Sequence, residues 1–475
     1  MPGKNVGMSY EIEADYQKQW LFPPSLEELL SADHPARMVR EFVEQQDLAR
    51  LGFKTRKSEQ GRPSYSAGLL LKVWLYGYVS GNRSCRGLER ACLDQMGMLW
   101  LTGMNPPDHT TLWRFWRDNR KAIRKLFKQL LQVALSLDLV GLVLHAVDGT
   151  KIQSQAAGEK GLHRERLKKR LSRLDEAIEE ILKQTEQAAA QEGGESRLPE
   201  GLQKQEQLKK KIQEQLKLLD EKQRDHFNAG DEEARMMKCR DQNRFAYNAQ
   251  AVADQASGLI VAANVVTDES DNYQLVPMLD HVEENLGRVA EQTIADAGYK
   301  AITGLAGAEE KNYSVMVNLA EPQDEPYHAS RFTYDAEKDQ CICPRGERLE
   351  FERTKERDKV EPYLVRVYHC KNYLQCPVRW QCSSSKTGRT VQVHPNHAAL
   401  VRQRQKHKDE ALRAALKKRC AIIEPVFGWG KEGMGFRRWT VRGLEKVNTQ
   451  WLLLCTTINL RRLHKHWVSG KLKFA

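Results

Sequence analysis

Residues 140–150 read VGLVLHAVDGT, an apolar run that ends on an acidic residue, and they decide the fold of the surrounding chain. The run from Val140 to Val147 is apolar and contains β-branched residues, so we expect a buried strand. Asp148 follows it directly, and Gly149 would let a backbone or a phosphate approach closely. The carboxylate of Asp148 is therefore expected at the end of a strand, at the edge of a sheet.

A mixed sheet with helices on its faces is expected around this strand, which places the chain in the α/β class. Asp296 repeats the arrangement of Asp148, because it follows an apolar run and precedes Ala297-Gly298. The other predicted elements of the core are a helix over 273–286 and strands over 245–253, 259–266, 293–295 and 314–319.

The chain upstream of this core is predicted to be helical. Apolar residues recur at helical spacing from Ser66 to Trp100, and another helix follows the loop at Pro106-Pro107-Asp108. Short helices joined by tight turns are typical of a helix-turn-helix region, although any small helical bundle has the same pattern. We assign residues 1–138 to an N-terminal helical domain for DNA binding or assembly.

Residues 161–235 are expected to form a helical hairpin that is inserted into the core. Their apolar residues recur at steps of four and three, as in a coiled-coil seam, and Gly193-Gly194 separates two stripes. A solvated charged segment is the alternative. The two stripes consist of Leu167, Leu171, Leu174, Ile178 and Ile181, and of Leu208, Ile212, Leu216 and Leu219.

The core then comprises residues 139–160 and 236–320. A second insertion over 321–400 holds a cluster of cysteines, and residues 401–475 form the C-terminal segment.

The net charge of +12 is concentrated in this last segment. Residues 401–475 carry 18 Lys and Arg against 5 Asp and Glu, a local +13 that leaves −1 for the rest of the chain. Such a concentration favours a polyanion, usually nucleic acid, over a merely solvated tail. Aromatic residues indicate that the segment folds: Trp429, Phe436, Trp439, Trp451 and Trp467. The expected phosphate contacts are Arg437, Arg438, Arg442 and Lys446.

Nothing in the sequence directs the chain to a membrane or out of the cell. No N-terminal stretch has the basic and apolar regions of a secretory signal. The longest apolar runs, 137–147 and 451–460, are too short to span a bilayer. We therefore expect a soluble, cytoplasmic protein with no membrane partner.

Three carboxylates are candidates for one metal-dependent site. Glu424, in the segment Ile422-Ile423-Glu424-Pro425, joins Asp148 and Asp296. Three carboxylates at one sheet edge would bind two divalent cations, Mg²⁺ or Mn²⁺, which activate a water or a 3′-hydroxyl and stabilise the leaving oxygen of a phosphodiester. Taken singly, an Asp at a strand end is more often a turn or cap residue.

The order of several short blocks resembles the DDE transposases of bacterial insertion sequences. The first and second catalytic blocks are similar to 147–152 and 295–299, and the third to 424–428 followed by Lys431. Further similar segments are 61–65, 107–111, 246–250, 271–275, 435–438, 442–444 and 459–460.

This resemblance implies a catalytic core with an RNase H-like fold, in which Asp148, Asp296 and Glu424 bind the metal ions. It also implies double-stranded DNA as the partner, both the terminal inverted repeats of the element and its target, a homodimer, and a place at the bacterial nucleoid. Lys431 fits the Lys of the family, suited to a DNA phosphate. Arg419 fits the Arg of the family and is also expected to contact DNA. Leu416 stands where the family often has Tyr.

The clustered cysteines suggest a metal more than a disulfide in an intracellular protein. Members of the family often carry a Cys-Pro start, a Cys-x-x-Cys-Pro pair and a final Cys, and this chain lacks the x-x spacing. Zn²⁺ bound by four thiolates and a set of reduced cysteines are both open, with Cys341 and His369 as spare ligands. The four candidate ligands are Cys343, Cys370, Cys376 and Cys382.

Three functions remain open from the sequence. The first is an active transposase that cleaves element ends and joins them to target DNA, and the presence of all three acids and Lys431 favours it. The second is a DNA-binding protein without the chemistry. The third is a nuclease that only hydrolyses, which the basic C-terminal segment and the helical N-terminal domain disfavour.

Overall fold

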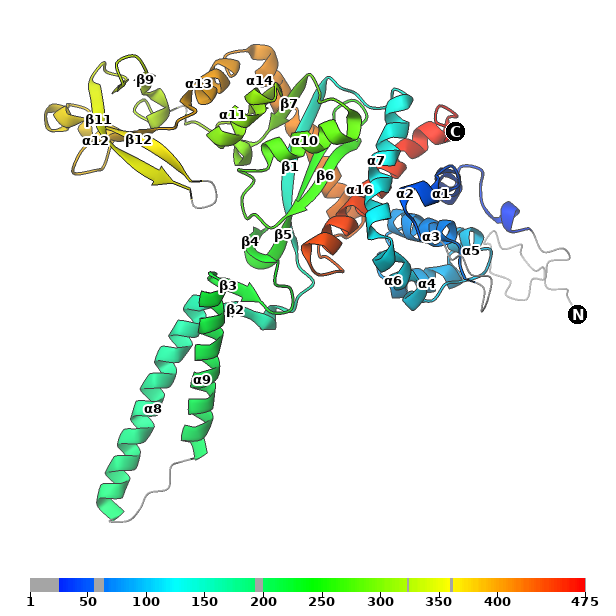
Figure 1. Ribbon diagram of the computed structural model, residues 1–475, viewed down its shortest axis with the longest axis horizontal. Helices are drawn as coiled ribbons and strands as arrows, with labels where there is room; N and C mark the ends of the chain where they lie inside the picture. The colour runs from blue at the N-terminus through cyan, green and yellow to red at the C-terminus, as the bar shows by residue number, and fades with distance from the viewer. Residues whose placement is uncertain (1–24, 55–63, 193–199, 323, 359–361, 475) are drawn as a thin grey trace, which may run out of the picture.

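The computed structural model describes residues 25–54, 64–192, 200–322, 324–358 and 362–474. The expected break at Gly193-Gly194 lies outside these residues, as do Gly61, Arg62 and Pro63. A central sheet has a group of helices on one side, a small β-rich unit on the other, and a long helical hairpin projecting away from it (Figure 1). No described helix is both long and apolar enough to cross a membrane.

The central sheet is mixed, which confirms the predicted α/β class. Its strand order is β4-β5-β1-β7-β8, with β6 on β5; β1 pairs antiparallel with β5 and parallel with β7. The strands are β1 (Leu144–Gln153), β4 (Arg235–Cys239), β5 (Gln242–Asp254), β6 (Ile260–Val266), β7 (Gln292–Ala295) and β8 (Val315–Val317).

The prediction that the first strand ends at Val147 is wrong. β1 continues to Gln153, because β5 keeps pairing with it from Asp148↔Ala251 onward, whereas pairing with β7 stops at Val147↔Ala295. Asp148 therefore lies inside a long strand, at the point where its parallel neighbour ends.

Helices cover the sheet, and the most buried of them is α16 (Leu444–Val468), which packs on β6 and on the N-terminal helices (Figure 1). Its side chains from Leu453 to Leu460 are buried. The basic C-terminal segment therefore contains a core helix, and is not a DNA-binding surface throughout. The other helices here are α10 (Leu275–Leu286), η3 (Ala297–Tyr299), α11 (Ile302–Glu310), α13 (His397–Lys406), α14 (Glu410–Lys417), α15 (Arg419–Gly428) and the π-helical turn η6 (Trp429–Gly433).

The N-terminal part is helical and packs on α16 chiefly through α3 and α7. Ser66, Ser84 and Asp108 cap their helices, each accepting a hydrogen bond from a backbone N–H of the first turn. The elements are η1 (Leu26–Leu29), α1 (Pro35–Glu44), α2 (Leu48–Leu51), α3 (Ala67–Val79), α4 (Cys85–Asp94), α5 (Met96–Thr102), α6 (His109–Asp118) and α7 (Arg120–Ser136).

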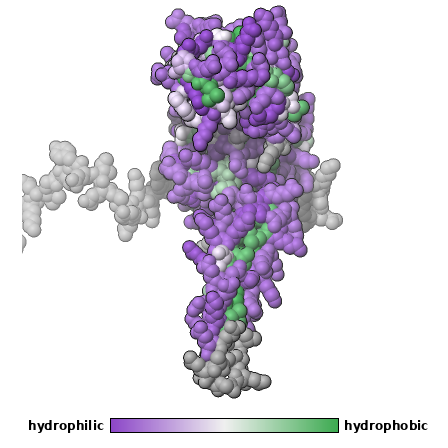
Figure 2. All heavy atoms as spheres, turned by 90° about the vertical axis from the view of Figure 1, so that its left-hand side faces the viewer, coloured by the Kyte–Doolittle hydropathy of each residue, from purple (hydrophilic) through white to green (hydrophobic). Residues whose placement is uncertain are grey.

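Two long helices, α8 (Arg164–Glu192) and α9 (Glu200–Glu221), form the projecting hairpin. An apolar stripe runs between them on an otherwise hydrophilic surface (Figure 2). The short elements η2 (Gly158–Lys160), β2 (Gly161–His163) and β3 (His226–Asn228) connect the hairpin to the core.

A separate antiparallel sheet, in the order β13-β12-β11-β10-β9, carries the cysteine-rich segment. Its own small core includes Phe332, Cys341 and Tyr368. The elements are η4 (Ala329–Arg331), β9 (Thr333–Asp335), β10 (Gln340–Ile342), β11 (Arg348–Arg357), β12 (Tyr363–His369), η5 (Lys371–Gln375), α12 (Arg379–Cys382) and β13 (Thr390–Val393).

Candidate active site

Asp148 and Asp296 lie side by side where β7 ends. The last parallel pair of β1 and β7 is Val147↔Ala295, and Asp148 and Asp296 are the next residues along the chain. Neighbouring strands are about 4.8 Å apart, so the two carboxylates face the same small space. Burial raises the pKa of Asp148; the guanidinium of Arg419 lowers it, and the charge of Asp296 raises it again. The pair thus concentrates negative charge in a half-buried place.

Each carboxylate is held by one backbone N–H. The N–H of Gly149 donates to Asp148 Oδ1 (2.7 Å), and that of Gly298 to Asp296 Oδ1 (2.9 Å). Arg419 donates from its guanidinium to the other oxygen of Asp148, Oδ2, at 2.7 Å. Arg419, expected from the sequence to contact DNA, is therefore the counter-charge of the acidic pair in this structure.

Glu424 shares α15 with Arg419. This helix begins at Arg419, and Pro425 lies inside it, where its ring nitrogen leaves one helical hydrogen bond unmade. α15 packs on β1 and β5 through buried apolar side chains, and Glu424 lies on its exposed side. A hydrogen bond with Glu424 raises the pKa of the Cys420 thiol, and the charge of Asp148 acts on it in the same direction.

The structure brings Asp148 and Asp296 together, with Glu424 on the helix that covers them. Within the described parts of the chain, no three His, Cys, Asp or Glu side chains are grouped closely enough to hold one metal ion.

Asp271 belongs to this cluster, although sequence reasoning did not single it out as a site residue. Its carboxylate accepts hydrogen bonds from Lys151 (2.9 Å), Asn248 (2.7 Å) and Gln250 (2.6 Å). A Cβ added at Gly149 would lie 2.7 Å from Asp271 Oδ1. The close approach that Gly149 was expected to permit is thus made by Asp271 and its amide partners.

The basic residues expected to bind DNA have different surroundings. Lys431 donates to the hydroxyl of Thr150, two residues from Asp148 on β1. Arg437 pairs with Glu432. Arg438 donates to the backbone carbonyls of residues 154, 155 and 156 and so fastens the chain to the end of β1.

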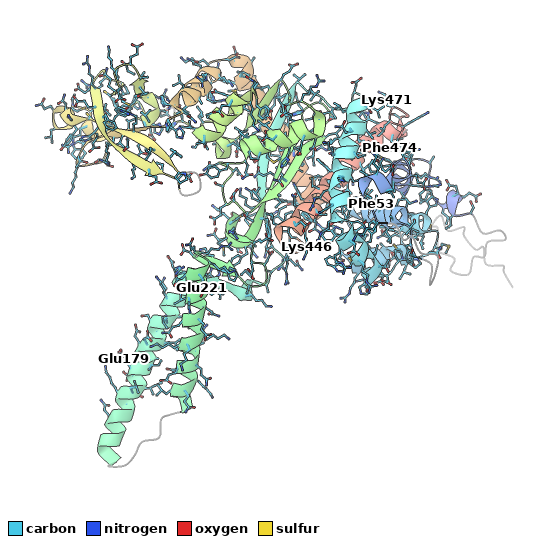
Figure 3. All side chains as sticks on the ribbon, viewed as in Figure 1. Phe53, Glu179, Glu221, Lys446, Lys471 and Phe474 are labelled. Atoms are coloured by element: carbon cyan, nitrogen blue, oxygen red, sulfur yellow. The ribbon has the colours of Figure 1, made fainter. Side chains whose placement is uncertain are left out.

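Arg442 is exposed and Lys446 half-buried, both at the start of α16. Pairing of the C-terminal arginines with acidic residues of the hairpin was the alternative to DNA binding. Figure 3 shows Glu179 far along the projecting hairpin, well away from Lys446. Since Arg437 and Arg438 have other partners as well, this alternative is wrong for them.

The four candidate zinc ligands line one cavity of about 300 Å³ in the small β-rich unit. Backbone N–H groups of Arg345 and Glu347 both lie 3.3 Å from the sulfur of Cys343. Burial raises the pKa of Cys370 and of Cys382, and the neighbouring cysteines raise it further. The two spare candidates lie elsewhere: Cys341 is in the apolar core, and His369 bonds to the carbonyl of Thr387.

Comparisons with known proteins point in one direction. The family model "Transposase DDE domain" matches residues 342–464, and "Transposase domain (DUF772)" matches residues 24–118. The first match includes Glu424 and Lys431 but neither Asp148 nor Asp296. No curated protein matches the chain.

Among solved structures, the chain is similar to a piggyBac transposase synaptic complex with hairpin DNA. The identity is 10%, the match covers 92% of this chain and 76% of that chain, and the TM-score is 0.32. A likeness this loose carries no argument about the fold or the site.

Proposed function

We propose that this chain, which belongs to the DDE transposases, cleaves the ends of an insertion element and joins them to target DNA. The observation that carries this proposal is the acidic pair of Asp148 and Asp296, held side by side where β7 ends and covered by the helix of Glu424. We assign the surrounding core to the RNase H-like fold.

The carboxylates where β7 ends are of the donor type that Mg²⁺ or Mn²⁺ prefers. One guanidinium, that of Arg419, pairs with Asp148 while Asp296 stands beside it, so the local charge still favours a further cation. Asp148, Asp296 and Glu424 would hold two ions, which supply an activated oxygen nucleophile and charge stabilisation at the leaving oxygen. Asp271 holds Lys151 beside the pair, and the N–H groups of Gly149 and Gly298 orient the two carboxylates.

The substrate is double-stranded DNA at the element ends and at the target. The excess charge of the C-terminal segment supports this assignment, together with the match of the N-terminal helices to a transposase domain. The resemblance to insertion-sequence enzymes supports a homodimer that acts at the bacterial nucleoid.

We also propose that Cys343, Cys370, Cys376 and Cys382 bind one structural Zn²⁺. The four cysteines line one small cavity and match the ligand number and type of a closed zinc site; since no three of them are grouped closely enough in this structure to hold one ion, binding would have to draw them together. The two backbone N–H groups at Cys343 would stabilise its thiolate form.

The function is tested with DNA taken from both flanks of the gene, labelled and incubated with the protein, Mg²⁺ and a target plasmid. We expect cleaved ends and their covalent joining to the plasmid. Cleaved ends that are never joined would leave only a hydrolytic nuclease. Binding of the flanking DNA without any cleavage would leave a DNA-binding protein.

A further inference from the structure

A second site lies next to the acidic pair, and it is positively charged. Lys151, Arg240, Arg244, Lys431 and Arg437 line a cavity of about 350 Å³, together with polar residues and a single carboxylate, Asp241. We call these five side chains and their cavity the basic pocket. Its walls come from β1, from β4 and β5 with the turn between them, and from η6 with the residues after it.

The charges of the basic pocket are only partly neutralised. Glu432 serves two guanidiniums, those of Arg240 (2.9 Å) and Arg437. In the part of the chain that the structure describes, neither Lys431 nor Arg244 forms an ion pair: Lys431 meets the hydroxyl of Thr150, and Arg244 meets two side-chain amides. Burial lowers the pKa of Lys431, and the charge of Arg240 lowers it further.

Like charges held together in this way cost free energy unless an anion completes the site. Gln153 (3.3 Å) and Gln242 (2.5 Å) fix the guanidinium of Arg244 by accepting its hydrogen bonds, so it is oriented without being neutralised. A planar guanidinium beside an ammonium suits a phosphate, which accepts from both.

The position of the basic pocket relative to Asp148 indicates which phosphate along a DNA strand it would bind. Thr150, the partner of Lys431, is two residues beyond Asp148 on the same face of β1, about 7 Å along the strand. One strand of DNA carries a charge for about every 3.4 Å of helix axis. A phosphate seated here therefore lies within about two nucleotides of the phosphate at the acidic pair.

We propose that the basic pocket binds a backbone phosphate of the DNA strand on which the acidic pair acts, and that Arg240 of the β4–β5 turn and Arg244 of β5 contact it directly. This inference rests on the proposed function, because it takes the substrate to be DNA. The contact positions the strand and reads no base sequence.

The test measures the binding of a labelled duplex of about 30 base pairs with arbitrary sequence, by fluorescence anisotropy at several salt concentrations in EDTA. Arg240→Gln and Arg244→Gln should each flatten the log–log salt dependence by about one unit, and the double variant by about two. Lys238→Gln is the matched control, since Lys238 is an exposed cation on β4 that faces away from its neighbour Cys239 in the pocket. It should leave the slope unchanged.

Alkylation of Cys239, followed by peptide mass spectrometry, reports on the place of binding because this thiol lines the basic pocket. The duplex should protect Cys239 in the wild type and less in the double variant. Arg240 is more than half exposed, so Arg240→Gln keeps the test valid if Arg244→Gln does not fold. Unchanged salt slopes in the folded variants, together with a Cys239 that the duplex leaves unprotected in the wild type, would overturn the inference. Failure of the wild type to join DNA, with the slopes altered as expected, would instead overturn the proposed function.

Discussion

Gly149→Ala tests whether the close packing around Asp271 maintains the site. The added Cβ would lie 2.7 Å from Asp271 Oδ1 and 3.0 Å from Asn248 Oδ1, and would overlap the amide nitrogen of Gln250. Gln250 cannot move aside freely, because it is fully buried and donates to both Asp271 (2.6 Å) and Asn248 (2.9 Å). Overpacking of this kind costs about 1–3 kcal/mol, and each hydrogen bond lost adds about 1 kcal/mol. We expect a local loss of about 2–4 kcal/mol.

The chain has several structural parts, so one global free energy of unfolding would not be well defined. Hydrogen exchange followed by mass spectrometry reads the loss locally, in peptides of β1 and β5. A loss of 2 kcal/mol or more corresponds to exchange about 30-fold faster. Gly428→Ala is the control, since a Cβ there meets nothing within 4 Å. Exchange in Gly149→Ala within about threefold of the wild type would refute the packing argument.

Purified protein should carry about one Zn²⁺ per chain by elemental analysis. Cys376→Ser should lose this zinc, whereas Cys420→Ser, at an exposed cysteine elsewhere, should keep it. A wild-type protein that is folded and active without metal would contradict the zinc proposal. Arg438→Gln should lower the melting temperature without changing the salt slope of DNA binding, because the guanidinium of Arg438 donates to three backbone carbonyls. A flattened slope at unchanged melting temperature would instead assign Arg438 to DNA binding. Burial holds the pKa of His145 below its ordinary value of about 6.5, so the unfolded chain takes up a proton before the folded one and stability is lost as the pH falls below about 6.5. Hydrogen exchange of β1 peptides at pH 7 and pH 5, corrected for the intrinsic exchange rate, should show a smaller acid loss of stability for His145→Gln than for the wild type, and equal losses would contradict this.

The elements of the core followed from local patterns, because buried strands carry continuous apolar runs. The predicted strand at 259–266 and helix at 273–286 differ by at most two residues from β6 and α10. The end of β1 could not be predicted in this way. The sequence Asp148-Gly149-Thr150 is typical of a turn, and only pairing with β5 keeps these residues in a strand.

The site was predicted only in part, because sequence similarity identifies candidate residues but does not show which side chains they contact. Asp148 and Asp296 are adjacent as their strand positions implied. Arg240 and Arg244 carry no local signal, and the similar segment 271–275 gives no role to Asp271, because these roles arise where β5, β1 and η6 meet in space. The net charge of the C-terminal segment also overstated its DNA-binding surface. This segment includes the buried helix α16, and Arg438 has a structural role.

In the proposed function, Asp148, Asp296 and Glu424 hold the divalent ions of a DNA-joining enzyme. Binding of Mn²⁺ to the protein in complex with DNA from the gene's flanks, measured by electron paramagnetic resonance, tests it most directly. Asp148→Asn, Asp296→Asn and Glu424→Gln should each lose at least one bound ion, while Glu284→Gln, at an exposed carboxylate on α10, should bind Mn²⁺ as the wild type does. Three variants that bind Mn²⁺ with the stoichiometry and affinity of the wild type would contradict the account.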